Sequence, residues 1–161
     1  MKAQKIFIAT LLLILLAAAL GGCSAAGQDK LNIYADDAKI AAEGDSYTFT
    51  NRVGGADEDD TLDLTYSGFT GSNSVWTVEF AESGTLTLQY QSTVKAGDFK
   101  VVLVGPEAQV LTLFEGAQLG EKTADLTAGK YTLKLVGREA SGSVNLVLEV
   151  VGNATVTKLD E

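Results

Sequence analysis

Four aspartates crowd into the segment 57–63. Asp57, Asp59 and Asp63 occupy alternating positions, with Asp60 between them. Calcium takes about six to eight oxygen ligands, and carboxylates of one loop can supply several of them. The twelfth position counted from Asp57 is Gly68 instead of glutamate, so the segment is not an EF-hand loop. Two interpretations stay open: a Ca²⁺ site completed by distant carbonyls, or a solvated acidic hairpin loop that keeps a sheet edge soluble.

Aromatic side chains offer a second kind of chemistry, the stacking of sugar rings. Tyr66, Phe69, Trp76 and Tyr90 could form a flat amphipathic platform. Phe69 follows Gly68 in a turn-rich stretch, which favours its exposure. Trp76 and Tyr90 are in register with apolar neighbours, which favours a place in the core. We predict Phe69 and Trp76 as ligand-binding residues, with core packing as the alternative.

The composition excludes most catalytic chemistry. The chain of 161 residues has no histidine, one cysteine and a formal charge of −9, from 21 acids and 12 bases. Without histidine, Ser-His-Asp and Cys-His catalysis are excluded, and one cysteine cannot build a thiolate metal cage. An acidic chain is repelled by nucleic-acid phosphates. We predict no enzyme, no cofactor other than a possible Ca²⁺ and no nucleic-acid partner; a carboxylate-dependent hydrolase is the remaining enzymatic alternative.

The first 22 residues form a predicted signal peptide. Lys2 and Lys5 precede an uncharged run from residue 6 to 20. Fifteen helical residues span about 22 Å, which is less than the roughly 30 Å hydrocarbon core of a bilayer. This pattern indicates a helical secretory signal and not a membrane-spanning helix.

The end of this segment, Leu20-Gly21-Gly22-Cys23, resembles the lipobox of bacterial lipoproteins. The resemblance implies cleavage before Cys23 and attachment of a diacylglyceryl group to its sulfur. Two acyl chains hold a protein stably on a membrane, whereas one holds it marginally. The expected organisation is a signal peptide at 1–22, a lipidated cysteine with a flexible tether at 23–30, and one domain at 31–161. The expected location is the cell membrane, facing away from the cytoplasm.

The remaining chain alternates apolar and polar residues in short runs separated by turn residues. This period of two predicts strands with one buried face. At 98–104, Val102 and Val104 predict burial on both faces, and 36–42 fits a weak helical turn or a short strand. Gly105 and Pro106 indicate a turn. The predicted strands cover 46–53, 61–66, 74–81, 84–90, 98–104, 110–114, 130–135, 143–150 and 154–159.

About eight to ten short strands predict an all-β fold, a single antiparallel β-sandwich or jelly roll. The stretches 128–137 and 141–148 resemble the closing strands of pre-peptidase C-terminal and carbohydrate-binding-module sandwiches. From residue 47 to 150 the chain also resembles small Gram-positive lipoproteins of unassigned function. The first resemblance implies an accessory, non-catalytic β-domain, and the second implies the class and location of the protein. We predict a binding domain for an envelope glycan, a protein or a divalent ion. The alternative is a structural or partner-subunit lipoprotein without a small ligand.

Overall fold

The protein is an antiparallel β-sandwich made from one folded sheet. The computed structural model describes residues 29–57 and 60–159. Within these ranges eight strands form a single sheet, whose path is β1-β3-β7-β4-β5. Strands β2 and β8 also pair with β3, and β6 pairs with β4. The predicted fold class is therefore confirmed.

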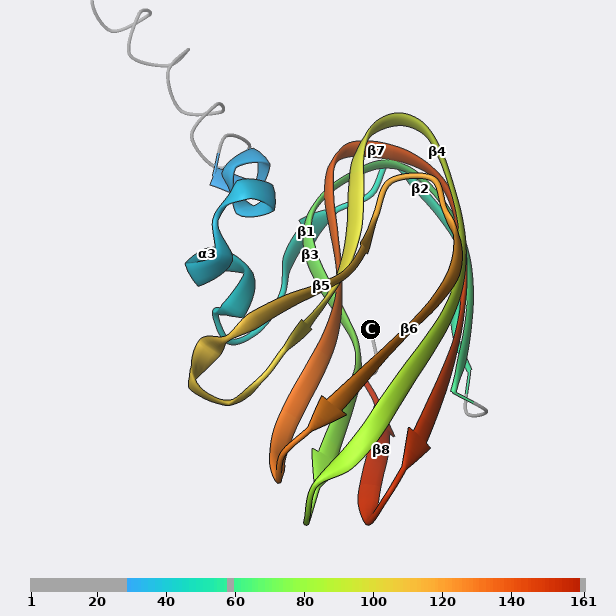
Figure 1. Ribbon diagram of the computed structural model, residues 1–161. Helices are drawn as coiled ribbons and strands as arrows, with labels where there is room; N and C mark the ends of the chain where they lie inside the picture. Colours follow the sequence, from blue (N-terminus) through green and yellow to red (C-terminus); the bar gives the residue numbers. More distant parts are fainter. Residues whose placement is uncertain (1–28, 58–59, 160–161) are drawn as a thin grey trace, which may run out of the picture.

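Three long strands form the centre of the sheet. They are β3 (Thr61–Phe80, 20 residues), β4 (Gly84–Val104, 21 residues) and β7 (Gly129–Val151, 23 residues). The sequence predicted two short strands in place of each of them, and this was wrong. Each pair of predicted strands is one strand that continues through a bend, and Figure 1 shows the three strands curving over together.

The short strands divide between the two halves of the long ones. β2 (Asn51–Ala56) and β6 (Leu119–Leu126) flank the first halves of β3 and β4 and complete the first layer. β1 (Ser46–Thr48), β8 (Ala154–Lys158) and β5 (Val110–Glu115) flank the second halves and complete the second layer. β6 was not predicted.

The bend coincides with glycines and with breaks in the ladder. The β3–β7 register shifts between Tyr66 and Gly71, and the β4–β7 register shifts between Val94 and Asp98. Gly71 has φ +109°, a conformation that side chains with a Cβ rarely adopt. Gly142 lies against the carbonyl group of Thr93, where a Cβ would overlap it. Glycine at these positions lets the strands turn and approach each other closely.

The core fills the space between the two layers. Tyr90 on β4 stacks on Phe114 of β5 with ring centroids 4.2 Å apart, so the aromatic contact joins opposite layers. The apolar residues of the predicted alternating runs point inward, as expected. Fully buried members of this core include Leu62, Leu64, Phe69, Trp76, Val78, Phe80, Leu86, Leu88, Phe99, Val101, Leu133, Leu135, Val144 and Leu146.

A helical segment covers the outer face of the second layer. It contains the 3₁₀-helix η1 (Asn32–Ala35) and the short helix α3 (Asp37–Ala41), which begins where Asp36 accepts a hydrogen bond from the amide of Lys39 at 3.2 Å. Ile33 and Ile40 pack on a second apolar cluster that contains Val102, Val104 and Val136. The burial of β4 on both faces is confirmed, and 36–42 contains a helical turn.

Tyr34 links this segment to the sheet. Its hydroxyl donates to the Glu115 carboxylate at 2.7 Å, and the cations of Lys100 and Arg138 lie 4.9 and 5.1 Å from its ring centroid. Lys30 donates to the carbonyl oxygen of Tyr47 at 3.1 Å, so contacts with the sandwich begin within the expected tether. Across residues 29–57 and 60–159, no helix is long and apolar enough to cross a bilayer.

Tyr66 provides a first test of the core. Its side chain is 2% exposed, and its hydroxyl has no hydrogen-bond partner among the described residues. A buried unpartnered hydroxyl costs about 1–3 kcal/mol of desolvation. We expect Tyr66→Phe to raise the free energy of unfolding by about 1 kcal/mol at neutral pH, measured by urea denaturation; a loss of 1 kcal/mol would contradict this.

The same variant has a pH signature. Burial raises the pKa of Tyr66 well above its ordinary value. An unfolded tyrosine ionises near pH 10, so above that pH the unfolded state releases a proton that the folded state keeps. Stability therefore falls as the pH rises above about 10. We expect a shallower fall in Tyr66→Phe than in the native protein.

Candidate functional site

The predicted acidic site lies at the β2–β3 hairpin. The carboxylate of Asp57 accepts hydrogen bonds from the Thr61 amide at 3.1 Å and the Thr61 hydroxyl at 2.7 Å. Asp60 has a left-handed backbone with φ 57°, and Asp63 is exposed on β3. Asp59 lies outside the described residues. The Asp57 carboxylate therefore closes its own turn.

A calcium ligand set is not assembled by these residues in the part of the chain that the structure describes. There, no group of three or more histidine, cysteine or acidic side chains is placed to hold a metal ion. The calcium site stays a prediction. Cys23 also lies outside the described residues, and its lipidation stays a prediction.

The two predicted ligand-binding aromatics belong to the core. Phe69 and Trp76 each have an exposed fraction of 0%. Phe69 stacks on Phe49 with centroids 4.4 Å apart and also contacts Phe99 at 6.3 Å. The prediction that these rings form an exposed sugar platform was wrong. β3 continues through the glycine-flanked stretch, so Phe69 faces the space between the layers and not solvent.

A cleft lies at one edge of the sandwich, where β6 borders the first layer and β5 the second. Its volume is about 610 Å³. Two turns meet there: the turn after β4, which contains the 3₁₀-helix η2 (Pro106–Ala108), and the turn between β6 and β7. We call this the edge cleft, defined by its lining residues Leu103, Gly105, Pro106, Glu107, Gln109, Val110, Leu111, Asp125, Leu126, Thr127, Ala128 and Tyr131.

The edge cleft combines apolar surface with polar groups. Leu103, Leu111 and Leu126 contribute apolar surface. Tyr131 is 7% exposed, and its hydroxyl donates to the carbonyl oxygen of Thr127 at 3.1 Å, which fixes the ring. The polar groups are the side chains of Glu107, Gln109, Asp125 and Thr127. An apolar surface with a few polar groups around it is the usual composition of a ligand site.

The backbone of this cleft is held in an unfavourable conformation. Glu107 and Ala108 both have φ 60°, in the left-handed region. Non-glycine residues pay about 1–2 kcal/mol each for this conformation. The turn is closed by the Gly105 amide, which donates to the Gln109 carbonyl oxygen at 2.8 Å. Two consecutive left-handed residues between antiparallel strands match the type I′ hairpin turn, so this conformation belongs to the connection between β4 and β5.

Sequence reasoning missed the edge cleft. It identified the turn at Gly105 and Pro106 but had no means to bring the turn at 127–128, some twenty residues later, to the same place. Glu107 alone carried no signal, because acidic residues are common in turns of an acidic chain. The two turns meet because the end of β4 pairs with the start of β7, Val104 with Thr132, while β5 and β6 pair with opposite halves of β4.

A shallower hollow lies on the outer face of the first layer. It has a volume of about 380 Å³ and is lined by the amides of Gln89, Gln91 and Asn145 and by the exposed Leu119. Gln89 donates to Glu149 at 3.4 Å. Tyr90 also lines this hollow, but its ring stacks inward on Phe114, and the hollow is smaller than the edge cleft.

No protein-family model and no curated protein sequence matches this chain. Solved structures give weak likenesses. A family two carbohydrate esterase from Cellvibrio japonicus superposes with a TM-score of 0.40 at 17% identity, over 71% of this chain and 33% of the esterase. The chain thus spans a third of that enzyme's length.

Two carbohydrate-binding modules are similar at the same level. The module Xyl-CBM35, solved with a glucuronic acid containing disaccharide, gives a TM-score of 0.37 at 16% identity over 71% of this chain and 82% of that one. The module CBM6cm-2 of Cellvibrio mixtus lichenase 5A, solved with cellotriose, gives 0.35 at 15% identity over 71% and 90%. At these TM-scores the ligands of those proteins do not transfer to this chain.

Proposed function

We propose that this protein is a non-catalytic binding module that holds a carbohydrate in the edge cleft. The observation that carries the proposal is the cleft itself, in which an ordered tyrosine and three leucines adjoin two carboxylates, an amide and a hydroxyl. A sugar ring has apolar C–H faces and a rim of hydroxyl groups, and it matches this arrangement. The volume of about 610 Å³ lies within the roughly 300–1,000 Å³ range of small-ligand sites.

The exposure of the carboxylates favours binding over hydrolysis. Glu107 and Asp125 are both exposed to solvent. A glycosidase needs one carboxyl group kept protonated, which burial in an apolar environment normally achieves. Two solvated carboxylates serve better as hydrogen-bond acceptors for sugar hydroxyls than as a general acid and its partner.

The proposal places this module on the outer side of a cell membrane. Its support is the sequence: the lysines, the apolar run and the box that ends at Cys23. A diacylated Cys23 would hold the domain at the envelope, where polysaccharides are at hand. The experiment for this part of the proposal is the Cys23→Ser variant. We expect it to lose both the acyl mass and the retention on membranes.

A protein partner is the second candidate function. Four large apolar side chains are exposed on the outward face of the first layer: Val53 at 61%, Leu119 at 81%, Val147 at 38% and Val151 at 70%. Exposed apolar residues on one face are typical of an interaction surface when they are contiguous. If a protein binds this face, substitutions in the edge cleft would leave that binding unchanged.

The carbohydrate function is tested by two substitutions matched in their backbone effect. Glu107→Gly removes a carboxylate and relieves the left-handed conformation, whereas Ala108→Gly relieves the same conformation and keeps the carboxylate. We expect Glu107→Gly to weaken polysaccharide affinity about tenfold or more, because hydrogen bonds to charged groups contribute about 1.5–3 kcal/mol. Ala108→Gly should bind as the native chain does.

The affinities are measured by isothermal titration calorimetry of the full chain in detergent, with a panel of envelope polysaccharides. Equal affinity of the two variants for every polysaccharide that the native chain binds would contradict a role for the Glu107 carboxylate. Absence of binding to the whole panel would contradict the proposed function.

A further inference from the structure

The edge cleft carries charge of one sign. Two carboxylates line it, Glu107 from the turn after β4 and Asp125 from β6, and its lining includes neither lysine nor arginine. Both side chains are exposed, and within residues 29–57 and 60–159 neither forms an ion pair with a cation. A ligand that enters the cleft therefore meets negative charge from two sides.

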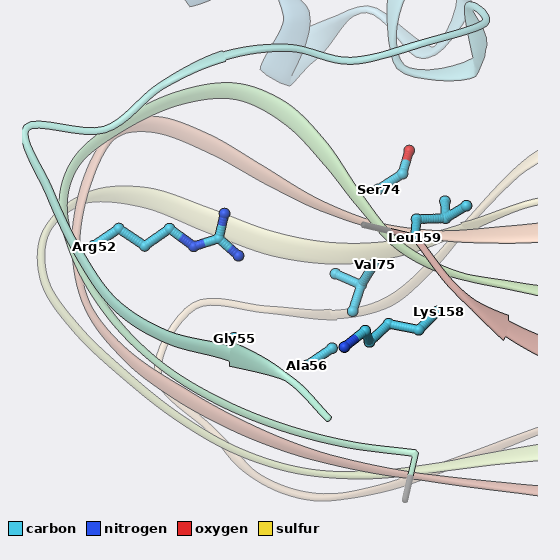
Figure 2. Close-up of a pocket in the computed structure, with 7 residues that line it drawn as sticks. All are labelled: Arg52, Gly55, Ala56, Ser74, Val75, Lys158 and Leu159. Carbon is cyan, nitrogen blue, oxygen red and sulfur yellow. The ribbon is translucent and has the colours of Figure 1, made fainter. Parts of the chain in front are cut away.

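Cations of the sandwich lie away from the cleft. Arg52 and Lys158 line a small cavity of about 110 Å³ at the opposite edge, between β2 and β8 (Figure 2). Four strand spacings, about 19 Å, separate β2 from β6 across the first layer, which is more than twice the Debye length at physiological ionic strength. Lys122 and Lys130 are nearer in sequence, but neither lines the cleft, and Lys130 pairs with Glu79 of β3.

The strongest hydrogen-bonding groups of the cleft are acceptors. One carboxylate oxygen of Asp125 accepts from the Thr85 hydroxyl at 3.0 Å, which leaves its second oxygen and the Glu107 carboxylate to a ligand. The Tyr131 hydroxyl already donates to the Thr127 carbonyl oxygen at 3.1 Å. An ammonium group offers three donors and no acceptor, whereas an ionised carboxylate offers acceptors alone. The cleft therefore matches a ligand rich in donors.

The walls of the cleft strengthen this selection. The two turns fit together through glycines: a Cβ on Gly105 would lie 3.0 Å from the Tyr131 ring, and one on Gly129 would lie 2.7 Å from the Pro106 ring. This close fit holds the turns, and with them the carboxylates, beside the apolar side chains of the cleft. A cleft with apolar walls and charges of one sign focuses the electrostatic field and concentrates ligands of the opposite charge.

We infer that the edge cleft selects a glycan with free, protonated amino groups over N-acetylated and carboxylated glycans. The inference rests on the proposed carbohydrate function and adds the charge of the ligand. A protonated amine compensates the negative charge of Glu107 and Asp125 and donates hydrogen bonds to them. Acetylation of the amine removes its charge, and a carboxylated sugar is repelled by both side chains.

The experiment is isothermal titration calorimetry of the full chain in detergent, at pH 6 and low ionic strength, where carboxylates are ionised and amines are protonated. The probes are a glucosamine tetramer, its N-acetylated counterpart and a galacturonic acid tetramer. We expect the glucosamine tetramer to bind at least tenfold more tightly than either of the others. Glu107→Gln and Asp125→Asn should each lower its preference over the acetylated tetramer at least threefold, because each removes a charge and keeps an oxygen acceptor.

Glu139→Gln is the matched control. It removes one exposed negative charge from β7, eight residues and so about 26 Å along the strand from Tyr131, and it should leave the preference unchanged. Equal affinity for the glucosamine and acetylated tetramers, or an equal loss of preference in Glu139→Gln, would overturn the inference and leave the proposed function standing. Failure of the glucosamine tetramer to bind also overturns the inference, whereas the proposed function fails only if the polysaccharide panel is not bound either.

Discussion

Phe69→Ala is expected to lower the free energy of unfolding by about 3–5 kcal/mol, as truncation of a fully buried phenylalanine does. Phe69 has no exposed surface and sits at the bend, where it contacts Phe49 at 4.4 Å and Tyr66 at 6.1 Å between ring centroids. Its ring also packs against Gly137, whose missing side chain makes room for it. Removal of the ring would leave a cavity at the bend, between the two halves of β3 and β7. Urea denaturation measures the change.

Leu119→Ala is the control for this loss. Leu119 is 81% exposed, so truncation of a comparably apolar side chain there should change stability by no more than about 0.5 kcal/mol. A Phe69→Ala variant that kept native stability and lost polysaccharide binding would show that Phe69 acts as a binding residue and that its placement in the core is wrong.

Gly71→Ala is expected to cost about 3 kcal/mol or more of stability. Gly71 has φ +109°, and a Cβ there would overlap the carbonyl oxygen of Ser46 and lie 2.9 Å from the Cα of Tyr47. Both neighbours belong to the backbone of β1, which pairs with β3 at this point. They cannot move without breaking the ladder, so the substitution strains the bend on which the sandwich depends.

Gly116→Ala separates the effect of a steric clash on stability from the effect of the left-handed backbone conformation. Gly116 also has a left-handed backbone, with φ +78°, but nothing lies within 4 Å of its Cβ position. It should lower the free energy of unfolding by only about 1–2 kcal/mol, because alanine is less stable than glycine in the left-handed conformation. Thermal or urea unfolding of both variants gives the comparison. Equal losses in the two would contradict the tight approach of β1 to the bend.

The sequence predicted the buried faces well because alternation directly reports which side of a strand meets the core. Leu86 and Leu88 on β4, and Leu133 and Leu135 on β7, are fully buried as expected. Val102 illustrates the finer case, in which an apolar residue on the polar face of a strand correctly predicted a second covering layer. The alternation of side chains between the two faces of a strand is a local property, so a short stretch of sequence is enough to predict it.

Strand continuity could not be predicted in the same way. A glycine that lets a strand bend, such as Gly71, has the same sequence appearance as a glycine that ends a strand. The turn-rich sequence around Phe69 therefore favours its exposure, whereas the continuous strand buries it. β6 was not predicted for a different reason: it is an edge strand with few buried residues and a polar sequence.

The edge cleft depends on long-range pairing, because it joins Glu107 of the turn after β4 with Asp125 of β6. Composition shows an excess of acid, and the order of residues locates its densest part at residues 57–63. The carboxylates of the edge cleft lie elsewhere, at the edge formed by β5 and β6.

The most direct test of the proposed binding function is a map of amide chemical shifts of the isotope-labelled chain titrated with an envelope polysaccharide fragment that it binds. The proposal predicts shifts concentrated at residues 105–111 and 125–131, around the Tyr131 ring. Shifts confined to Gln89, Gln91 and Leu119 on the outer face, with the edge cleft unchanged, would contradict it.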